Sequence, residues 1–116
     1  MPNASHKDFA CLLNIIDSID KIKKYSEPFN NADDLYHDTK SFDAVMMNFV
    51  IIGEMAEKLS DEFKSTESQN DWFKIRGFRN IIAHNYFGID AEEVWQIIEN
   101  SLNDLEVNLK KIVEKL

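Results

Sequence analysis

The chain of 116 residues has the length of one domain, and 44% of its residues are apolar while 29% are charged, which is typical of a globular protein. The single cysteine excludes an internal disulfide, and the longest aliphatic or aromatic run, residues 49–52, is too short to span a bilayer. The formal net charge of −8 argues against broad electrostatic binding to nucleic acid, which depends on neutralising phosphates. With no visible targeting segment, we expect one domain, residues 1–116, in the cytoplasm.

Helices are predicted throughout, because only three glycines and two prolines interrupt the chain. The first helix is predicted over residues 7–25, where apolar residues recur at steps of three and four and form one face. The segment 26–31, with Pro28, ends it, and a short helical turn is expected over residues 31–38. The apolar face comprises Phe9, Leu12, Leu13, Ile16 and Ile19.

A second long helix is predicted over residues 41–59. Two small residues on its buried side, Gly53 and Ala56, should let another helix approach closely. The polar segment 60–70 then forms a loop, with one extra helical turn expected at 61–63. The buried side of this helix comprises Phe42, Val45, Met46, Phe49, Ile52, Gly53, Ala56 and Leu59.

A third helix is predicted to begin at Asn70 or Asp71, either of which can cap it, and to end near Ala83 or His84. Residues 84–88 then form a connector. On a helical wheel this segment has a core-facing side and an opposite side that is cationic and amide-bearing. The first side holds Ile75, Phe78 and Ile82, and the second holds Arg76, Arg79, Asn80 and Ala83.

The last helix is predicted to start at Asp90, a favourable N-cap, with Glu93 placed to complete a capping box. Its apolar residues follow a heptad pattern, so they must pack on the bundle core, on a second copy of the chain, or on both. The elements together predict an all-α, up-and-down bundle of four to five helices with sequential helices antiparallel. The heptad residues are Ile98, Leu102, Leu105, Leu109, Ile112 and Leu116.

One segment combines residues suited to phosphodiester chemistry. No Asp or Glu occurs between positions 72 and 87, whereas Lys74, Arg76 and Arg79 are basic, so a local positive patch can hold one or two phosphates. Arg79 offers a planar fork of donors to phosphate oxygens, and His84 can exchange a proton near neutral pH. RNA brings its own nucleophile, the 2′-hydroxyl, so no metal is required.

Spacing limits this interpretation. Arg79 and His84 lie five residues apart, about 140° from each other on a continuous helix. They can meet at one phosphate only if the helix ends near His84 or if two subunits combine. The residues alone leave open an ordinary solvated helix face.

A family resemblance adds to this reading. Residues 79–86, Arg-Asn-Ile-Ile-Ala-His-Asn-Tyr, resemble the R-x4-H-x-Y signature of HepT-like proteins in the HEPN superfamily. The stretches 51–60 and 72–80 resemble that family's "IGE…K.LS" and "W..I.GMRN" segments, with Phe78 where Met is usual. Ile89-Asp90 and Val94-Trp95 resemble its "ID…VW", so the similarity spans roughly residues 42–112.

The resemblance implies a HEPN-like helical fold and a homodimer in which two motifs face one cleft. It further implies a toxin with metal-independent ribonuclease activity, sometimes on transfer RNA. The expected partner is an MNT-type nucleotidyltransferase antitoxin that adenylylates the motif tyrosine, Tyr86. In this chain Arg79 and His84 would be catalytic, with Asn80 supporting them. No metal, cofactor or membrane is expected.

Other residues allow more than one interpretation. Arg76 is a supporting candidate on the cationic side, and Glu54 is either a partner of Arg79 or His84 or a plain surface carboxylate. Tyr86 can equally pack its ring with its hydroxyl at the surface. The acidic stretch 33–38 fits no well-attested metal site and is expected to be a solvated turn.

Two other functions stay open at this point. The chain can be a non-catalytic nucleotide- or RNA-binding partner of a nucleotidyltransferase, which its net acidity favours. It can also be a structural adaptor that assembles through the heptad residues of the last helix.

Overall fold

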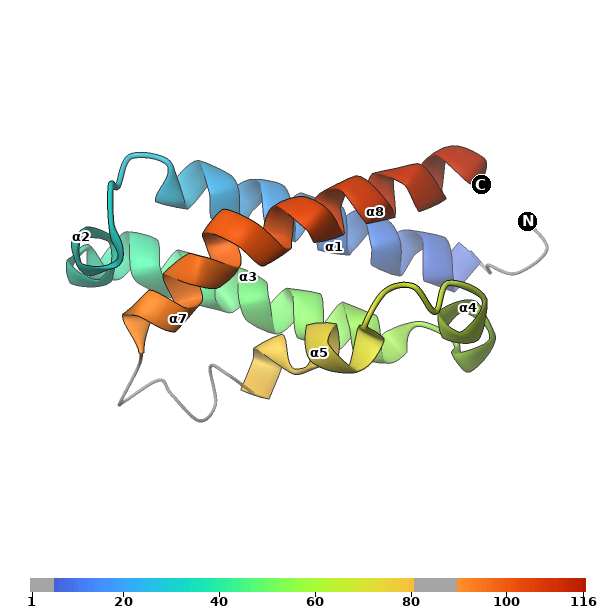
Figure 1. Ribbon diagram of the computed structural model, residues 1–116. Helices are drawn as coiled ribbons and strands as arrows, with labels where there is room; N and C mark the ends of the chain where they lie inside the picture. Colours follow the sequence, from blue (N-terminus) through green and yellow to red (C-terminus); the bar gives the residue numbers. More distant parts are fainter. Residues whose placement is uncertain (1–5, 81–89) are drawn as a thin grey trace.

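Every secondary-structure element is helical in the part of the chain that the computed structural model describes, residues 6–80 and 90–116. Two long helices, α1 (His6–Ser26) and α3 (Thr39–Lys58), lie antiparallel, and the short α2 (Ala32–His37) connects them (Figure 1). The predicted all-α class and the first two long helices are confirmed, with ends that differ by one or two residues.

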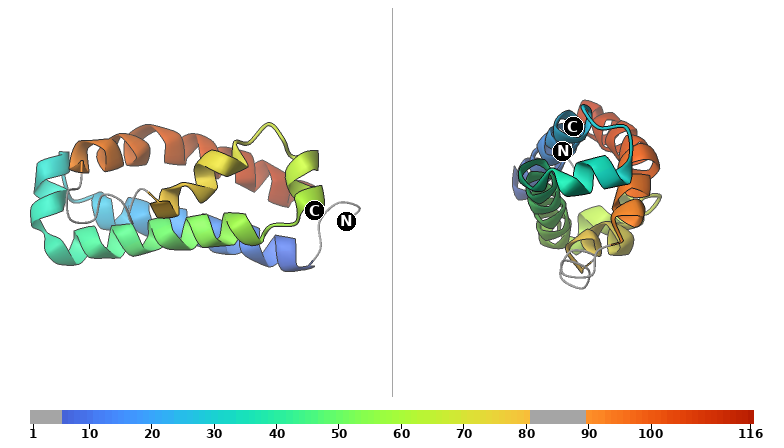
Figure 2. Two further views of the ribbon diagram at one scale, coloured as in Figure 1. Left: turned by 90° about the horizontal axis from the view of Figure 1, so that it is seen from below. Right: turned by 90° about the vertical axis from the view of Figure 1, so that its left-hand side faces the viewer.

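The second half of the chain packs on this pair. The short α4 (Asp61–Thr66) turns the chain at one end, and α5 (Trp72–Arg76) runs back along α3. The chain then continues through α7 (Ala91–Gln96) into α8 (Leu102–Lys115), which packs on α1. Figure 2 shows α5 lying obliquely between α3 and the last helix, so the predicted up-and-down bundle is confirmed.

Side-chain caps explain where the helices begin. Asp71 accepts a hydrogen bond from the Lys74 amide at 3.0 Å, and Asp90 accepts one from the Glu93 amide at 3.1 Å, as predicted for N-caps. In the same way, the hydroxyl of Ser60 caps α4, and buried Asp8 accepts hydrogen bonds from both the amide and the hydroxyl of Ser60. This contact fixes the start of α1 against the start of α4.

The core lies between the long helices. Burying one large aliphatic side chain contributes about 1.5–3 kcal/mol, so the fully buried residues of α1, α3 and α8 supply most of the stability. The heptad residues predicted for the last helix face this core, with Leu116 partly buried. The largest fully buried side chains include Leu12, Ile15, Ile19, Ile22, Met46, Ile52, Leu102 and Leu109.

The last helix differs from its prediction in one respect. Residues 97–101 form a π-helical turn, η1 (Ile97–Ser101), between α7 and α8. A π-turn accommodates an extra residue and rotates the following side chains relative to a regular α-helix. Val94 and Leu102, on either side of the turn, are therefore both buried.

The prediction of a continuous third helix is wrong. α5 ends at Arg76, Gly77 forms a turn, and residues 78–80 are helical again. Glycine is a poor helix former, and the Asn80 amide donates to the Gly77 carbonyl three residues earlier, which tightens the chain at this point. The predicted helix end at Ala83 or His84 and the connector lie outside the described residues.

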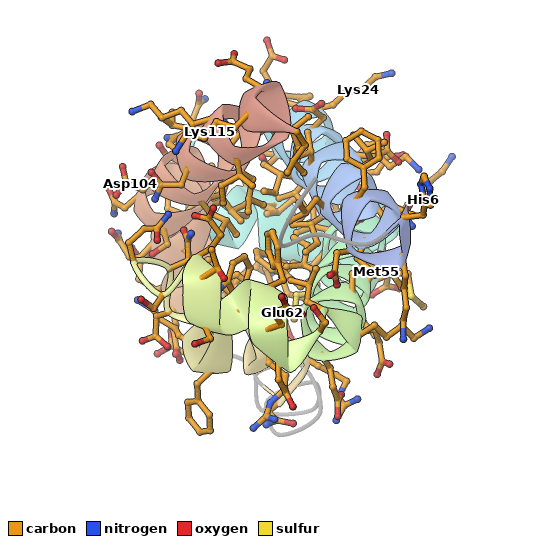
Figure 3. The ribbon with its side chains drawn as sticks, turned by 90° about the vertical axis from the view of Figure 1, so that its right-hand side faces the viewer. His6, Lys24, Met55, Glu62, Asp104 and Lys115 are labelled. Atoms are coloured by element: carbon orange, nitrogen blue, oxygen red, sulfur yellow. The ribbon has the colours of Figure 1, made fainter. Side chains whose placement is uncertain are left out.

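Most charged side chains among the described residues lie on the outside, and Asp8 is buried. Figure 3 shows Lys24, Asp104 and Lys115 projecting away from the bundle. Over residues 6–80 and 90–116, no group of three or more His, Cys, Asp or Glu side chains is placed to hold a metal ion. A search of the same residues finds no helix with the length and apolar character needed to cross a membrane.

Candidate functional site

The candidate site forms where the chain after α5 crosses α3, and Gly53 makes that crossing close. A Cβ atom added to Gly53 would lie 2.9 Å from the Arg76 carbonyl oxygen and 2.9 Å from the amide nitrogen of Arg79. These are backbone atoms that cannot move independently, so only glycine fits here without a shift. The close approach predicted for Gly53 is thus observed, and it sets the backbone of Arg79 against α3.

Arg79 points along α3 toward two carboxylates. Its Nη1 lies 2.5 Å from Oε1 of Glu54 and 3.0 Å from Oε2 of Glu57. Glu54 and Glu57 are three residues apart on one helix, so both side chains lie on the same face. All three side chains are about two-fifths exposed, which leaves the cluster open to solvent.

This environment fixes the charge state of Arg79. The hydrogen bond that Arg79 donates to Glu54, followed by the charges of Glu54 and Glu57, raises the pKa of Arg79 further above its ordinary value. The guanidinium therefore stays cationic at every physiological pH. Two carboxylates around one guanidinium nevertheless give the cluster a formal charge of −1 when both are ionised.

The cluster can still accept an anion in a defined direction. Both hydrogen bonds between described residues use Nη1, whereas a guanidinium has five N–H donors spread over three nitrogens. The Nε–Nη2 edge of Arg79 has the geometry for a bidentate contact with a phosphate. Glu54 and Glu57 therefore orient the guanidinium while they compete electrostatically with any anionic ligand.

The other two candidates among the described residues, Arg76 and Asn80, make different contacts. The Arg76 guanidinium lies over the Phe73 ring, 5.2 Å from its centroid. Asn80 is exposed, and its backbone amide closes the turn at Gly77. The structure thus brings Glu54 and Arg79 together and places Arg76 beside Phe73.

His84 and Tyr86 lie outside the described residues, so the predicted convergence of Arg79 and His84 stays a prediction. One residue escaped the sequence analysis as a site candidate. Glu57 contacts Arg79 as directly as Glu54 does, and its position three residues after Glu54 was the available signal. The acidic stretch 33–38 instead serves local structure, since Asp38 caps α3.

Comparison with known proteins gives a family match. The model of the family described as ribonuclease HepT-like matches residues 15–112 of this chain. A protein of Methanocaldococcus jannaschii, named for gamma-glutamylcyclotransferase and candidate RNase functions, is 31% identical over 95% of this chain and 50% of its own length. A candidate RNase of Caldanaerobacter subterraneus is 33% identical over 62% of this chain and 64% of its own length.

A third relative matches over nearly its whole length. A candidate ribonuclease HepT of Thermococcus cleftensis is 27% identical over 93% of this chain and 96% of its own length. This chain therefore spans about half to two thirds of the first two relatives and almost all of the third. No solved structure matches this chain significantly.

Proposed function

Because this chain belongs to the ribonuclease HepT-like family, we propose that it is a metal-independent endoribonuclease and the toxin of a type II toxin–antitoxin pair. The observation that supports this most is the placement of Arg79, the first residue of the R-x4-H-x-Y motif. Its guanidinium is solvent-accessible and is oriented by two carboxylates at the crossing with α3. The Nε–Nη2 edge of the oriented guanidinium has the geometry for a bidentate contact with a phosphodiester.

The proposed reaction uses the 2′-hydroxyl of the substrate. A general base takes the proton of that hydroxyl as its oxygen forms a bond to phosphorus, and the bond from phosphorus to the 5′-oxygen breaks. A general acid gives the leaving 5′-oxygen a proton, which leaves a 2′,3′-cyclic phosphate and a 5′-hydroxyl. We assign proton transfer to His84, and charge stabilisation of the phosphorane to Arg79. Electrostatic stabilisation of this kind is typically worth a factor of about 10²–10³ per donor.

The neighbouring residues receive supporting roles. Glu54 and Glu57 hold the guanidinium in one orientation, so that its Nε–Nη2 edge meets the phosphate without further loss of side-chain freedom. Asn80 and Arg76 lie on the same segment and provide further polar contacts to the RNA. Transfer RNA is a candidate substrate.

We further propose that a homodimer completes the site. Residues 47, 51 and 54 recur at steps of four and three along α3, so they share a face. Met47 is 59% exposed and Ile51 is partly exposed, which extends an apolar strip up to Glu54 and Arg79. A second copy that covers this strip would bring two Arg79 side chains to one cleft.

We also propose control by an MNT-type nucleotidyltransferase antitoxin, the partner that the family resemblance implies. Transfer of AMP to the hydroxyl of Tyr86 would add bulk and a negative phosphodiester seven residues after Arg79. Both would exclude a substrate phosphate from the guanidinium. Co-expression with the candidate antitoxin and mass spectrometry should then show AMP additions that disappear in Tyr86→Phe.

Cleavage of RNA in EDTA tests the enzyme directly. Wild-type protein should cut single-stranded or transfer RNA, and Arg79→Ala and His84→Ala should each lose about a hundredfold or more in rate. Lys110→Ala, which removes an ion-paired cation on α8, is the matched control and should cleave like wild type. Undiminished cleavage in both motif variants would refute the assignment.

One alternative has its own support. The carboxylate pair on Arg79 and the net charge of −8 favour a non-catalytic partner that binds a nucleotide or RNA without cutting it. Titration with RNA, followed by the fluorescence of the two tryptophans, would then show saturable binding, and the RNA would stay intact.

A further inference from the structure

An open groove lies on the other side of α5 from the Glu54–Arg79 contact. It has a volume of about 530 Å³, which is within the range of small-ligand sites, and it separates α5 from α7 and the π-turn η1. The apolar part of its lining includes Phe73 and Ile97. The polar part includes Lys74, Glu93, Gln96, Asn100 and Ser101.

Phe73 is the most unusual residue of this lining. Its exposed fraction is 77%, the highest among the large hydrophobic residues that the structure describes as exposed. The Arg76 guanidinium lies 5.2 Å from the ring centroid, and Lys74 is the next residue along the chain. An exposed ring with cations beside it is the arrangement that stacks nucleic-acid bases while attracting the backbone.

The opposite wall carries hydrogen-bonding groups. Gln96 donates to Glu92, and Asn100 donates to Gln96 at 3.0 Å, so a ladder holds these amides along the groove. Glu93 adds a carboxylate that would repel a phosphate but accept a hydrogen bond from the amino group of a base. The groove therefore favours the base of a nucleotide over its phosphate.

A smaller hollow adjoins the groove. One residue in its lining has a hydrogen-bond donor without a partner among the described residues. It has a volume of about 190 Å³ and shares Lys74, Phe78 and Ser101 with the groove. Asn70 lines it, is only 7% exposed, and has an Nδ2 atom without a hydrogen-bond partner among the described residues. Since buried donors are rarely left unpaired, this atom is suited to a ligand oxygen.

We propose that this groove binds an unpaired base of the RNA, stacked on Phe73, with Asn70 donating to an oxygen of the same or the next nucleotide. The inference rests on the proposed ribonuclease function and gives it a site for the substrate beyond the phosphate. A subunit contact is the competing occupant. Charged residues are depleted from the centres of protein interfaces, whereas Lys74 and Glu93 line this groove and Arg76 lies beside the Phe73 ring.

The test measures binding of a labelled single-stranded RNA in EDTA, with His84→Ala as the background so that the RNA is not cleaved. Phe73→Leu keeps an apolar side chain but removes the stacking surface, so affinity should fall about tenfold. Phe73→Trp should bind within about twofold of the parent, because the ring is retained. Tyr36→Leu removes another exposed ring, on α2, and should change nothing.

Two further measurements distinguish base stacking on Phe73 from other causes of a change in RNA affinity. An abasic oligomer of equal length and charge should bind the parent and Phe73→Leu equally well. Asn70→Ala should weaken RNA binding about threefold without lowering the melting temperature, because the donor it removes has no hydrogen-bond partner among residues 6–80 and 90–116.

Each outcome decides the proposal. Unchanged RNA affinity in Phe73→Leu would overturn the base site, and so would sedimentation showing that this variant loses a dimer that the parent forms. If wild type cleaves RNA but Phe73→Leu binds and cleaves equally well, only the base site fails. If wild type binds RNA through Phe73 but never cleaves it, only the proposed ribonuclease fails.

Discussion

Two helix contacts in this molecule have a cluster of charges at their edge, and they differ in what surrounds the charges. Where α8 packs on α1, Lys23 lies 2.6 Å from Glu106, whose side chain is only 14% exposed at the edge of the hydrophobic core. Where the chain crosses α3, Arg79 meets two carboxylates that are 39% and 45% exposed. The first contact lies between two long helices. The second is made by the chain that follows a five-residue helix, which ends in a glycine turn.

This difference suggests that the α1–α8 contact serves stability and that the crossing with α3 serves chemistry. Long buried helix faces supply the free energy of folding, and an ion pair at their rim adds little to it. The crossing at Gly53 instead presents a fixed, partly exposed cation to solvent, which a substrate can reach. Removing side chains should therefore affect folding at the first contact and activity at the second.

The largest effect on stability is expected in the α8 core. Leu102 is fully buried, so Leu102→Ala should lower the free energy of unfolding by about 2–5 kcal/mol. Arg79→Ala should lower it far less, because partly exposed ion pairs contribute little to stability. Urea denaturation followed by circular dichroism measures both, and equal losses would contradict the distinction.

Gly53→Ala should affect both properties. The added methyl group would meet backbone atoms at 2.9 Å, so the chain at residues 76–79 must move away from α3, at a cost of about 1–3 kcal/mol. RNA cleavage should fall with it, because Arg79 moves relative to Glu54. Lys40→Ala, at an exposed position on the same helix, is the stability control. An unchanged melting temperature and rate in Gly53→Ala would show that the crossing is not tight.

Glu57→Gln tests how the carboxylates beside Arg79 affect RNA affinity. The change removes one of two negative charges beside Arg79 and keeps a side chain that accepts a hydrogen bond. RNA affinity should rise about two- to fivefold at low salt, since less repulsion opposes the phosphate. Glu27→Gln, outside the cluster, is the charge-matched control. A loss of affinity in Glu57→Gln would mean that Glu57 positions the guanidinium more than it competes with RNA.

The smallest effect is expected at the rim of the α1–α8 contact and depends on pH. A hydrogen bond with Glu106 raises the pKa of Asp20, so the folded protein holds that proton more tightly than the unfolded chain does. The resulting stability is present in acid, below the ordinary pKa of 3.8, and is lost as the pH rises through the raised pKa.

Asp20→Asn imitates the protonated carboxyl, so it should raise the free energy of unfolding at pH 7 by about 0.5 kcal/mol and give no gain below pH 3.8. Asp17→Asn, one turn earlier on the same helix, should show no such pH dependence. Chemical denaturation at several pH values distinguishes the two variants. A gain in the free energy of unfolding that is equal at every pH would contradict a proton held by Asp20 in its hydrogen bond with Glu106.

The sequence predicted the parts of the fold that follow from periodicity. The apolar face of α3, the heptad residues of α8 and the N-caps Asp71 and Asp90 all occur as expected, because each depends on residues close together in the chain. The close contact at Gly53 was also predictable, since a small residue in a buried helix face favours close approach.

The rest depended on tertiary contacts. The turn at Gly77 arises where the chain packs on Gly53, and a helical wheel treats that segment as regular. The π-turn at residues 97–101 keeps both Val94 and Leu102 buried, and the heptad steps did not reveal it. Pairing of Arg79 with Glu57 required knowing which helix lies opposite, although pairing with Glu54 was among the expectations.

The central claim is that Arg79 and His84 cleave RNA through the 2′-hydroxyl without a metal. The most direct measurement is mass spectrometry of the RNA fragments made in EDTA by wild-type protein, with a substrate that carries one 2′-deoxy nucleotide at the cut position. We expect RNA fragments with 2′,3′-cyclic phosphate and 5′-hydroxyl ends, and no cut at the 2′-deoxy position. Fragments with 3′-hydroxyl and 5′-phosphate ends, or cleavage at the 2′-deoxy position, would contradict it.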